Sequence, residues 1–116
     1  HFFTGDAHAS QGDGEVTGVA LEIPAKVTVT FELKKGYPIE WPRILSETFL
    51  MVAGSGRPLD AAARIAWVEL IDWLATDYGF DRLQAYHLLG QVGQMRLGNM
   101  VDPKFTMVAK FPRRYL

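Results

Sequence analysis

Residues 26 to 34 alternate cleanly between polar and apolar side chains. The sequence KVTVTFELK places four apolar residues on one side of an extended chain: Val27, Val29, Phe31 and Leu33. Successive side chains of a β-strand point to opposite faces, so a period of two predicts a strand with one buried and one solvated face. Strands of this kind belong to antiparallel sheets in most proteins. The segment therefore predicts that the chain forms an antiparallel sheet.

Three further stretches predict the other strands of that sheet. VTGVALEI, residues 16 to 23, is apolar on one face and small or polar on the other. The stretch after Gly36 contains Pro38 and Pro42, which argue against a helix and against a long central strand, so we expect two short strands at 39–43 and 48–52. KFTMVAKF, residues 104 to 111, predicts the last strand.

Two helices are predicted between these strands. Gly54 and Gly56 form a loop before a helix over residues 58–78, and Gly79 is suited to end that helix. DRLQ, beginning at Asp81, has the form of a capping box that starts a second helix. The predicted fold is α+β and β-rich: an antiparallel sheet or sandwich with two helices inserted before the last strand, in a single domain over residues 1–116.

Composition excludes several classes of protein. The net charge of −1 gives no reason to expect a nucleic-acid or membrane-surface binder. No apolar run approaches the roughly 20 residues that span a bilayer. The chain has no cysteine, so disulfides and thiolate zinc sites are excluded, and we expect a cytoplasmic protein.

The loop GDAHASQGDGEV, residues 5 to 16, contains three acidic residues, one histidine and three glycines, but no lysine or arginine. It lacks the Gly-Lys-Ser/Thr ending of a P-loop. Counted from Asp6 as an EF-hand, it has Gln11 where glycine is needed and Thr17 where glutamate is needed. Ser10 is flanked by Ala9 and Gln11, so it lacks the Gly-x-Ser-x-Gly pattern of a nucleophile elbow.

Asp6-x-His8 remains as the candidate site. In an extended chain the two side chains point the same way, where they can bind one divalent metal ion or the aspartate can orient the histidine. Asp13 and Glu15 are general-base candidates. The alternative is an exposed hairpin loop, in which Asp and Gly are common. A bound cation would relieve the repulsion among these acids, about 1 kcal/mol per close exposed pair.

Other polar and aromatic residues carry weaker signals. Glu22 shares a predicted strand face with Gly18 and Ala20, whose small side chains leave room for a ligand. His87 is expected to be a core or boundary histidine beside two leucines. The tryptophans are expected to be core or interface anchors: Trp41, Trp67 and Trp73.

The stretch GDAHASQGDGEVTGVALEIP resembles the signature of the acetamidase/formamidase family. AYHLLGQVGQMRLGNMVDPKFTMVAKFP resembles the closing helix, Val-Asp-Pro turn and last strand of the same family. The resemblance covers nearly the whole chain, but family members are considerably longer. It therefore implies a β-rich fold of which this chain is the C-terminal part. The chain begins in an apparent strand, HFFT, so we also expect further sequence to be supplied upstream or by another polypeptide.

The resemblance implies hydrolysis of short aliphatic amides to carboxylate and ammonia with a divalent metal, zinc being expected first. It implies that Asp6 and His8 either bind the metal directly or support a residue that does. It gives roles in catalysis or substrate positioning to Gln11, Asp13 and Glu15. A base such as Glu15 would move the proton of water to the leaving nitrogen. Substrate contacts are assigned to the remaining candidates: Gly12, Gly14 and Glu22.

Two other functions remain open at this point. One is a non-catalytic β-rich interaction module, and the other is a divalent-cation-binding domain without turnover. Apolar segments such as HFF and FTMVAKF would be exposed in an incomplete β-fold, so we expect a homo-oligomer or association with a missing N-terminal portion. A small amide is the expected substrate.

Overall fold

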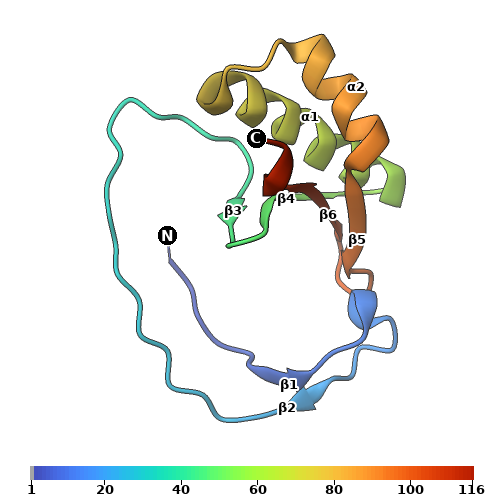
Figure 1. Cartoon of the computed structure of the whole chain (residues 1–116). Coiled ribbons are helices and arrows are strands. Elements are labelled where there is room, and N and C mark those ends of the chain that lie inside the picture. Colours follow the sequence, from blue (N-terminus) through green and yellow to red (C-terminus); the bar gives the residue numbers. More distant parts are fainter. Residues whose placement is uncertain (1) are drawn as a thin grey trace.

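The computed structural model describes residues 2–116, so His1 lies outside the described part. A four-stranded antiparallel sheet in the order β3-β4-β6-β5 carries two helices on one face (Figure 1). The elements of this body are β3 (Arg43–Leu45), β4 (Phe49–Gly56), α1 (Leu59–Tyr78), α2 (Arg82–Val92), β5 (Gln94–Asn99) and β6 (Phe105–Pro112). The α+β class and the antiparallel pairing are as predicted.

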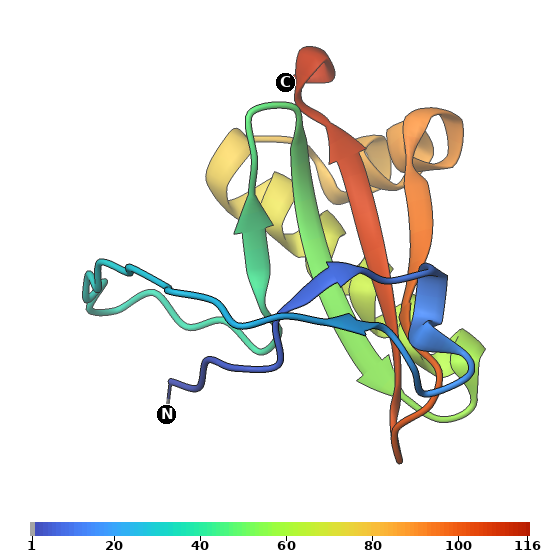
Figure 2. The ribbon, with the colours of Figure 1, turned by 90° about the horizontal axis from the view of Figure 1, so that it is seen from below.

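The N-terminal part forms a separate two-stranded antiparallel ribbon of β1 (His8–Ser10) and β2 (Leu21–Glu22). A 3-10 turn, η1 (Asp13–Glu15), lies between them and packs against β5 (Figure 2). A second short turn, η2 (Arg113–Tyr115), closes the chain. The ribbon is thus tied to the main sheet through η1.

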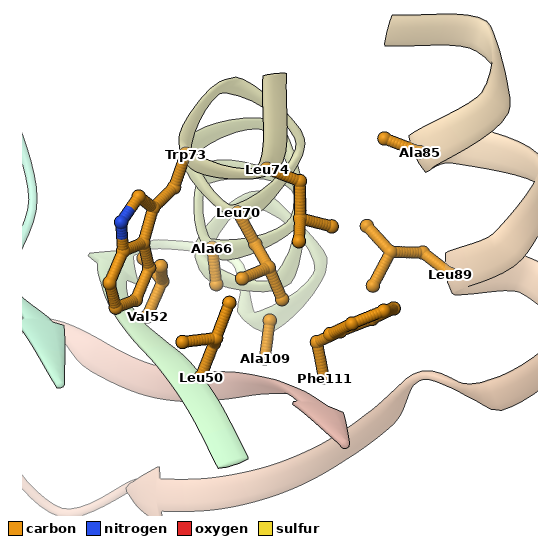
Figure 3. Close-up of a cluster of buried hydrophobic side chains, with 10 residues drawn as sticks. All are labelled: Leu50, Val52, Ala66, Leu70, Trp73, Leu74, Ala85, Leu89, Ala109 and Phe111. Carbon is orange, nitrogen blue, oxygen red and sulfur yellow. The ribbon is translucent and has the colours of Figure 1, made fainter. Parts of the chain in front are cut away.

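The hydrophobic core lies between α1 and the two central strands. Leu70 and Leu74 of α1 are fully buried against Leu50 of β4 and Phe111 of β6 (Figure 3). Burying a side chain of this size contributes about 1.5–3 kcal/mol. The complete cluster is Leu50, Val52, Ala66, Leu70, Trp73, Leu74, Ala85, Leu89, Ala109 and Phe111. None of the helices in residues 2–116 is both long enough and apolar enough to span a bilayer.

The helix boundaries follow their predicted signals. Asp81 is the N-cap of α2, where its Oδ1 accepts hydrogen bonds from Leu83 N at 2.9 Å and Gln84 N at 3.3 Å. The Gln84 side chain accepts from the Asp81 N–H, which completes the capping box. Gly79 ends α1 with φ 73°, a left-handed conformation that glycine adopts without strain.

The prediction of a loop at Gly54 and Gly56 is wrong, because both residues belong to β4. Gly54 is buried where β4 crosses α1. A Cβ atom there would lie 2.5 Å from Ala62 O and 2.6 Å from Ala66 N. Only glycine permits two backbones to come this close, so Gly54 is a packing residue of the strand.

We expect Gly54→Ala to lower the free energy of unfolding by about 3 kcal/mol, at the upper end of typical overpacking costs, because the helix backbone must move. Urea denaturation followed by circular dichroism measures the change. Gly90→Ala is the control, since a Cβ on α2 at that position meets nothing within 4 Å. It should raise stability by up to about 1 kcal/mol. Equal losses in both variants would contradict this account of Gly54.

The sequence prediction missed β5. Its sequence QMRLGN follows Gly93 directly and pairs with β6, so the two helices precede the last two strands rather than the last one. In consequence β6 lies in the middle of the sheet, between β4 and β5. FTMVAKF is therefore not an exposed apolar edge, contrary to the expectation that it would drive association.

The alternating segment 26–34 forms no strand in the structure. No strand lies between Glu22 and Arg43, and residues 21–40 are all exposed. The strand predicted over 16–23 is reduced to Leu21–Glu22, because the residues after η1 turn at Gly18, φ 71°. The strand predicted at 48–52 occurs as Phe49–Gly56, whereas the strand predicted at 39–43 shares only Arg43 with the observed Arg43–Leu45. A strand needs a hydrogen-bonded neighbour, which the described residues do not offer to 26–34.

The far end of this extended segment is fixed to α1 by a polar network. The Tyr37 hydroxyl donates to Asp77 and accepts from Arg43 Nη1 at 2.9 Å. Burial would raise the pKa of Asp77, but hydrogen bonds from Tyr37, Thr76 and Trp73 outweigh it and lower the pKa. The network holds residues 37–43 against the helix.

Candidate metal centre

Pairing of β1 with β2 brings together three residues that are distant in sequence. His8 of β1 lies opposite Glu22 of β2, and Ile23 N donates to Ala7 O at 3.0 Å. Asp6 precedes β1 by two residues. Its side chain reaches that of His8, as predicted, but from a left-handed backbone at φ 56° and not from an extended one. One ligand atom from each of Asp6, His8 and Glu22 lies within 4.8 Å of the others.

The imidazole of His8 is the centre of this cluster. Its Nε2 lies 2.9 Å from Glu22 Oε1 and 3.3 Å from Asp6 Oδ1, and the side chain is only 10% exposed. Nε2 is nevertheless a buried atom without a hydrogen bond, because neither oxygen lies in line with an Nε2–H bond. The two carboxylates flank the nitrogen instead of accepting from it.

Gln11 determines which nitrogen of His8 carries the proton. Gln11 Oε1 lies 2.8 Å from His8 Nδ1 and, being a carbonyl oxygen, accepts a hydrogen bond. Nδ1 is therefore the protonated nitrogen of the neutral ring, and the Nε2 lone pair is directed at two carboxylates. Such an arrangement is repulsive unless a cation lies between them, as it does in metal sites whose histidine is oriented by a second hydrogen bond.

The electrostatic field at His8 favours positive charge. Its hydrogen bond with Gln11 is the largest influence that raises the pKa of His8. The negative charges of Glu22, Asp6 and Glu15 raise the pKa further, against the opposing effect of desolvation. The field stabilises either a proton or a metal ion at Nε2, but a proton there would have no acceptor in line.

Two acidic residues of the loop adopt unusual backbone conformations. In the described residues 2–116, Asp6 at φ 56° and Glu15 at φ 46° are the residues other than glycine with positive φ. Such conformations cost about 1–2 kcal/mol for residues with a Cβ atom. They are concentrated at functional sites, where surrounding contacts maintain them. The strain therefore marks the same loop as the cluster of ligand atoms does.

The loop is held in place by β5. Gly14 is buried at φ 77°, its carbonyl accepts from Met100 N at 2.8 Å, and a Cβ would lie 2.4 Å from Leu97 Cδ2. Arg96 Nη2 donates to Asp13 Oδ1 at 2.7 Å, which raises the pKa of Arg96. The absence of lysine and arginine from the loop predicts that its acidic residues are uncompensated. Asp13 is instead paired with Arg96 of β5.

The structure separates the predicted site residues into two groups. Asp6, His8, Gln11 and Glu22 converge, whereas Asp13 turns to β5. Glu22 was predicted as a substrate contact and lies among the possible metal ligands. Gly14 packs on Leu97, and Gly12 lies in open space. The predicted catalytic roles of Gln11, Asp13 and Glu15 and the predicted substrate contacts of Gly12 and Gly14 stay predictions.

The remaining candidates lie elsewhere. His87 is exposed, contrary to its predicted core or boundary position, because it faces outward from α2. With Trp67 it borders an apolar depression of about 640 Å³ between α1 and α2. Trp73 is buried in the core, and Trp41 packs against that core.

The donor set at His8 fits a divalent ion such as zinc. Zinc binds imidazole nitrogen and carboxylate oxygen at about 2.0–2.2 Å in tetrahedral geometry, which places ligand atoms about 3.3–3.6 Å apart. Asp6 Oδ1, 3.3 Å from Nε2, matches this spacing, Glu22 Oε1 is closer at 2.9 Å, and all three ligand atoms lie within 4.8 Å of one another. Three protein ligands leave one position for water, as in catalytic zinc sites.

Comparison with known proteins gives consistent relatives. The Acetamidase/Formamidase family profile matches residues 1–114. The chain is similar to the acetamidase from Yersinia enterocolitica, with 46% identity and a TM-score of 0.89. It is also similar to the acetamidase from Bacillus halodurans, with 30% identity and a TM-score of 0.83. Both superpositions cover 93% of this chain but only 33% and 37% of those proteins. No curated protein sequence matches the chain.

Proposed function

The chain belongs to the acetamidase/formamidase family, and from this membership we propose that it contributes a zinc site to the hydrolysis of short aliphatic amides such as formamide and acetamide. The observation that carries the proposal is the unpartnered Nε2 of His8, enclosed between the carboxylates of Asp6 and Glu22. The chain spans about a third of the length of the acetamidases it matches, so the activity belongs to the whole enzyme.

The proposed reaction converts an amide and water to a carboxylate and an ammonium ion, in equilibrium with ammonia. A bound divalent ion supplies polarisation of the amide carbonyl and a lowered pKa of water. We assign proton transfer from water to the leaving nitrogen to Glu15, whose charge is felt at His8 and whose backbone is held at positive φ. The N–H of Gly12, beside open space, is assigned to the developing oxyanion.

Asp13 and Gly14 have a different part in this proposal. The ion pair of Asp13 with Arg96 and the packing of Gly14 on Leu97 fix the loop to β5. In this proposal they hold Glu15 in place. The proposal likewise uses Gln11 to orient His8, because its carbonyl accepts a hydrogen bond from the imidazole.

Ammonia release from formamide and acetamide tests the proposed activity. The whole enzyme that contains this chain is purified and assayed with added zinc and after chelation. The proposal requires release that depends on zinc and is lost in Glu15→Gln, which keeps the size of the side chain but cannot accept the proton. Release that is unaffected by chelation would contradict the proposal. Stoichiometric zinc without release would support a cation-binding domain instead.

A second prediction concerns the effect of Gln11 on the affinity for zinc. Gln11→Leu removes the acceptor for His8 Nδ1–H, and we expect zinc affinity to fall about 10- to 100-fold, as for other outer-shell partners. Gln11→Glu keeps an acceptor and should retain the wild-type affinity or exceed it. Competition with a chromogenic chelator measures both.

Gln91→Leu is the matched control for Gln11→Leu, because Gln91 is an exposed glutamine on α2, away from the ribbon. Its zinc affinity should stay within twofold of the wild type. If Gln11→Glu binds zinc as weakly as Gln11→Leu does, the hydrogen bond to Nδ1 is not what the residue contributes.

A further inference from the structure

The segment Lys26–Lys34 has the sequence pattern of a β-strand, but no strand of the described residues pairs with it. Its four apolar side chains are 45–78% exposed: Val27, Val29, Phe31 and Leu33. Their alternation with Thr, Glu and Lys is the pattern of a strand buried on one face. A chain that exposes a continuous apolar row normally uses it to bind another surface.

Both ends of the segment are anchored, so its extended course is not that of a free tail. On one side the β1–β2 ribbon precedes it, with Ile23 N bonded to Ala7 O. On the other side Tyr37 is bonded to Asp77 of α1. Figures 1 and 2 show the connecting arc extending away from the four-stranded sheet. Phe31 of the segment packs edge-on against Phe2, with 4.8 Å between the two ring centroids.

Both superpositions on the solved acetamidases cover 93% of this chain. About two thirds of each matched acetamidase chain has no counterpart here. Those proteins therefore contain additional polypeptide that is long enough to cover the segment.

We propose that Lys26–Lys34 pairs with a β-strand from the remaining two thirds of an acetamidase-type polypeptide. The free backbone groups of the segment give the hydrogen bonds, and its apolar row gives the buried face. Lys26 and Lys34 at the two ends favour acidic residues opposite them on the partner strand.

The pairing strand also borders the candidate metal centre. A gap of about 260 Å³ lies between residues 4–7 and the start of the segment, and Asp6 and Val27 both line it. A strand docked along Lys26–Lys34 covers this gap and shields Asp6, whose side chain is 74% exposed in the chain alone. This consequence rests on the proposed function, whereas the docking itself does not.

A second copy of the chain is a poorer partner on grounds of charge. Antiparallel pairing of the segment with itself about Thr30 places Lys26 opposite Lys34 twice. Like charges directly opposite each other destabilise a strand pair. A different polypeptide with acidic residues at these positions avoids the repulsion.

Co-expression tests the docking directly. The 116-residue chain is produced together with the two thirds of the Yersinia enterocolitica acetamidase that it does not match, chosen because the matched part is 46% identical. We expect a one-to-one complex in which hydrogen exchange of the amides in 26–34 slows at least tenfold. No complex, a complex with unchanged exchange in 26–34, or a homodimer paired through this segment would overturn the proposal.

A pair of exposed-residue variants identifies the binding face. Val29→Lys places a charge in the apolar row and should weaken the complex at least tenfold, whereas Thr28→Lys changes the opposite face and should weaken it less than threefold. Both side chains are exposed in the chain alone, so neither variant should alter its unfolding curve. Equal effects would contradict docking through the apolar row. Zinc affinity is measured in parallel, so a failed metal site and a failed docking surface give separate results.

Discussion

Replacing His8 with alanine is expected to lower zinc affinity by more than 100-fold and to abolish zinc-dependent amide hydrolysis. The loss should exceed that of Gln11→Leu, because among residues 2–116 His8 supplies the only nitrogen of the ligand cluster and lies between both carboxylates. Equilibrium competition with a chelator measures the affinity. His8→Gln is the second variant, since it keeps a polar side chain in β1 while losing the imidazole.

His87→Ala is the matched control, because it removes an exposed histidine from α2 and leaves the ribbon unchanged. Its zinc affinity should stay within twofold of the wild type. Zinc affinity that is lost in His87→Ala, or kept in both His8 variants, would place the metal elsewhere in the protein.

Glu69→Leu is expected to lower the free energy of unfolding by about 3 kcal/mol or more. Glu69 of α1 accepts from Arg43 Nε at 2.7 Å, and both side chains are only 10% exposed. Removing one partner leaves a buried charge that Asp77, 3.9 Å from Arg43 Nη1, compensates only in part. The loss is a large fraction of the stability of a domain of this size, so a clearly lower midpoint of urea denaturation is expected.

The double variant Arg43→Met, Glu69→Leu is the control for this prediction. Replacing a buried ion pair with apolar side chains of similar volume is often neutral, and Met can pack on the Trp73 ring that Arg43 covers. The double variant should lie within about 1 kcal/mol of the wild type in urea denaturation. A double variant as unstable as Glu69→Leu would mean that Glu69 contributes by packing and not by charge.

Local signals predicted the helical half of the fold well. The capping box at Asp81 and the left-handed Gly79 depend on a few neighbouring residues, and both were found where the sequence placed them. The loop at Gly54 was wrong because its glycine serves a contact with α1, which no local pattern encodes. β5 was missed because QMRLGN gains its strand conformation from pairing with β6.

The segment 26–34 shows the opposite failure, in which a strong local pattern has no structure to match it. Alternation indicates which face of a strand is buried but says nothing about which chain buries it. The described residues provide no pairing strand, so the pattern is expressed only as an extended, exposed course.

The candidate site was predictable in part. Asp6 and His8 are two residues apart and their side chains meet as the spacing predicts, although Asp6 adopts a left-handed φ of 56° and not the extended conformation assumed. Glu22 reaches them only through the register of β1 with β2, and Arg96 reaches Asp13 from 83 residues away. Neither contact has a local sequence signal. The cytoplasmic location and the identity of the metal stay predictions of composition and of the family resemblance.

A crystal structure of the protein grown with zinc, using anomalous scattering at the zinc edge, tests the central claim most directly. The account predicts one strong peak bonded to His8 Nε2 and to carboxylate oxygens of Asp6 and Glu22, with Gln11 still bonded to Nδ1. A peak at another site, or an Nε2–H that donates to Glu22 with no ion present at saturating zinc, would contradict it.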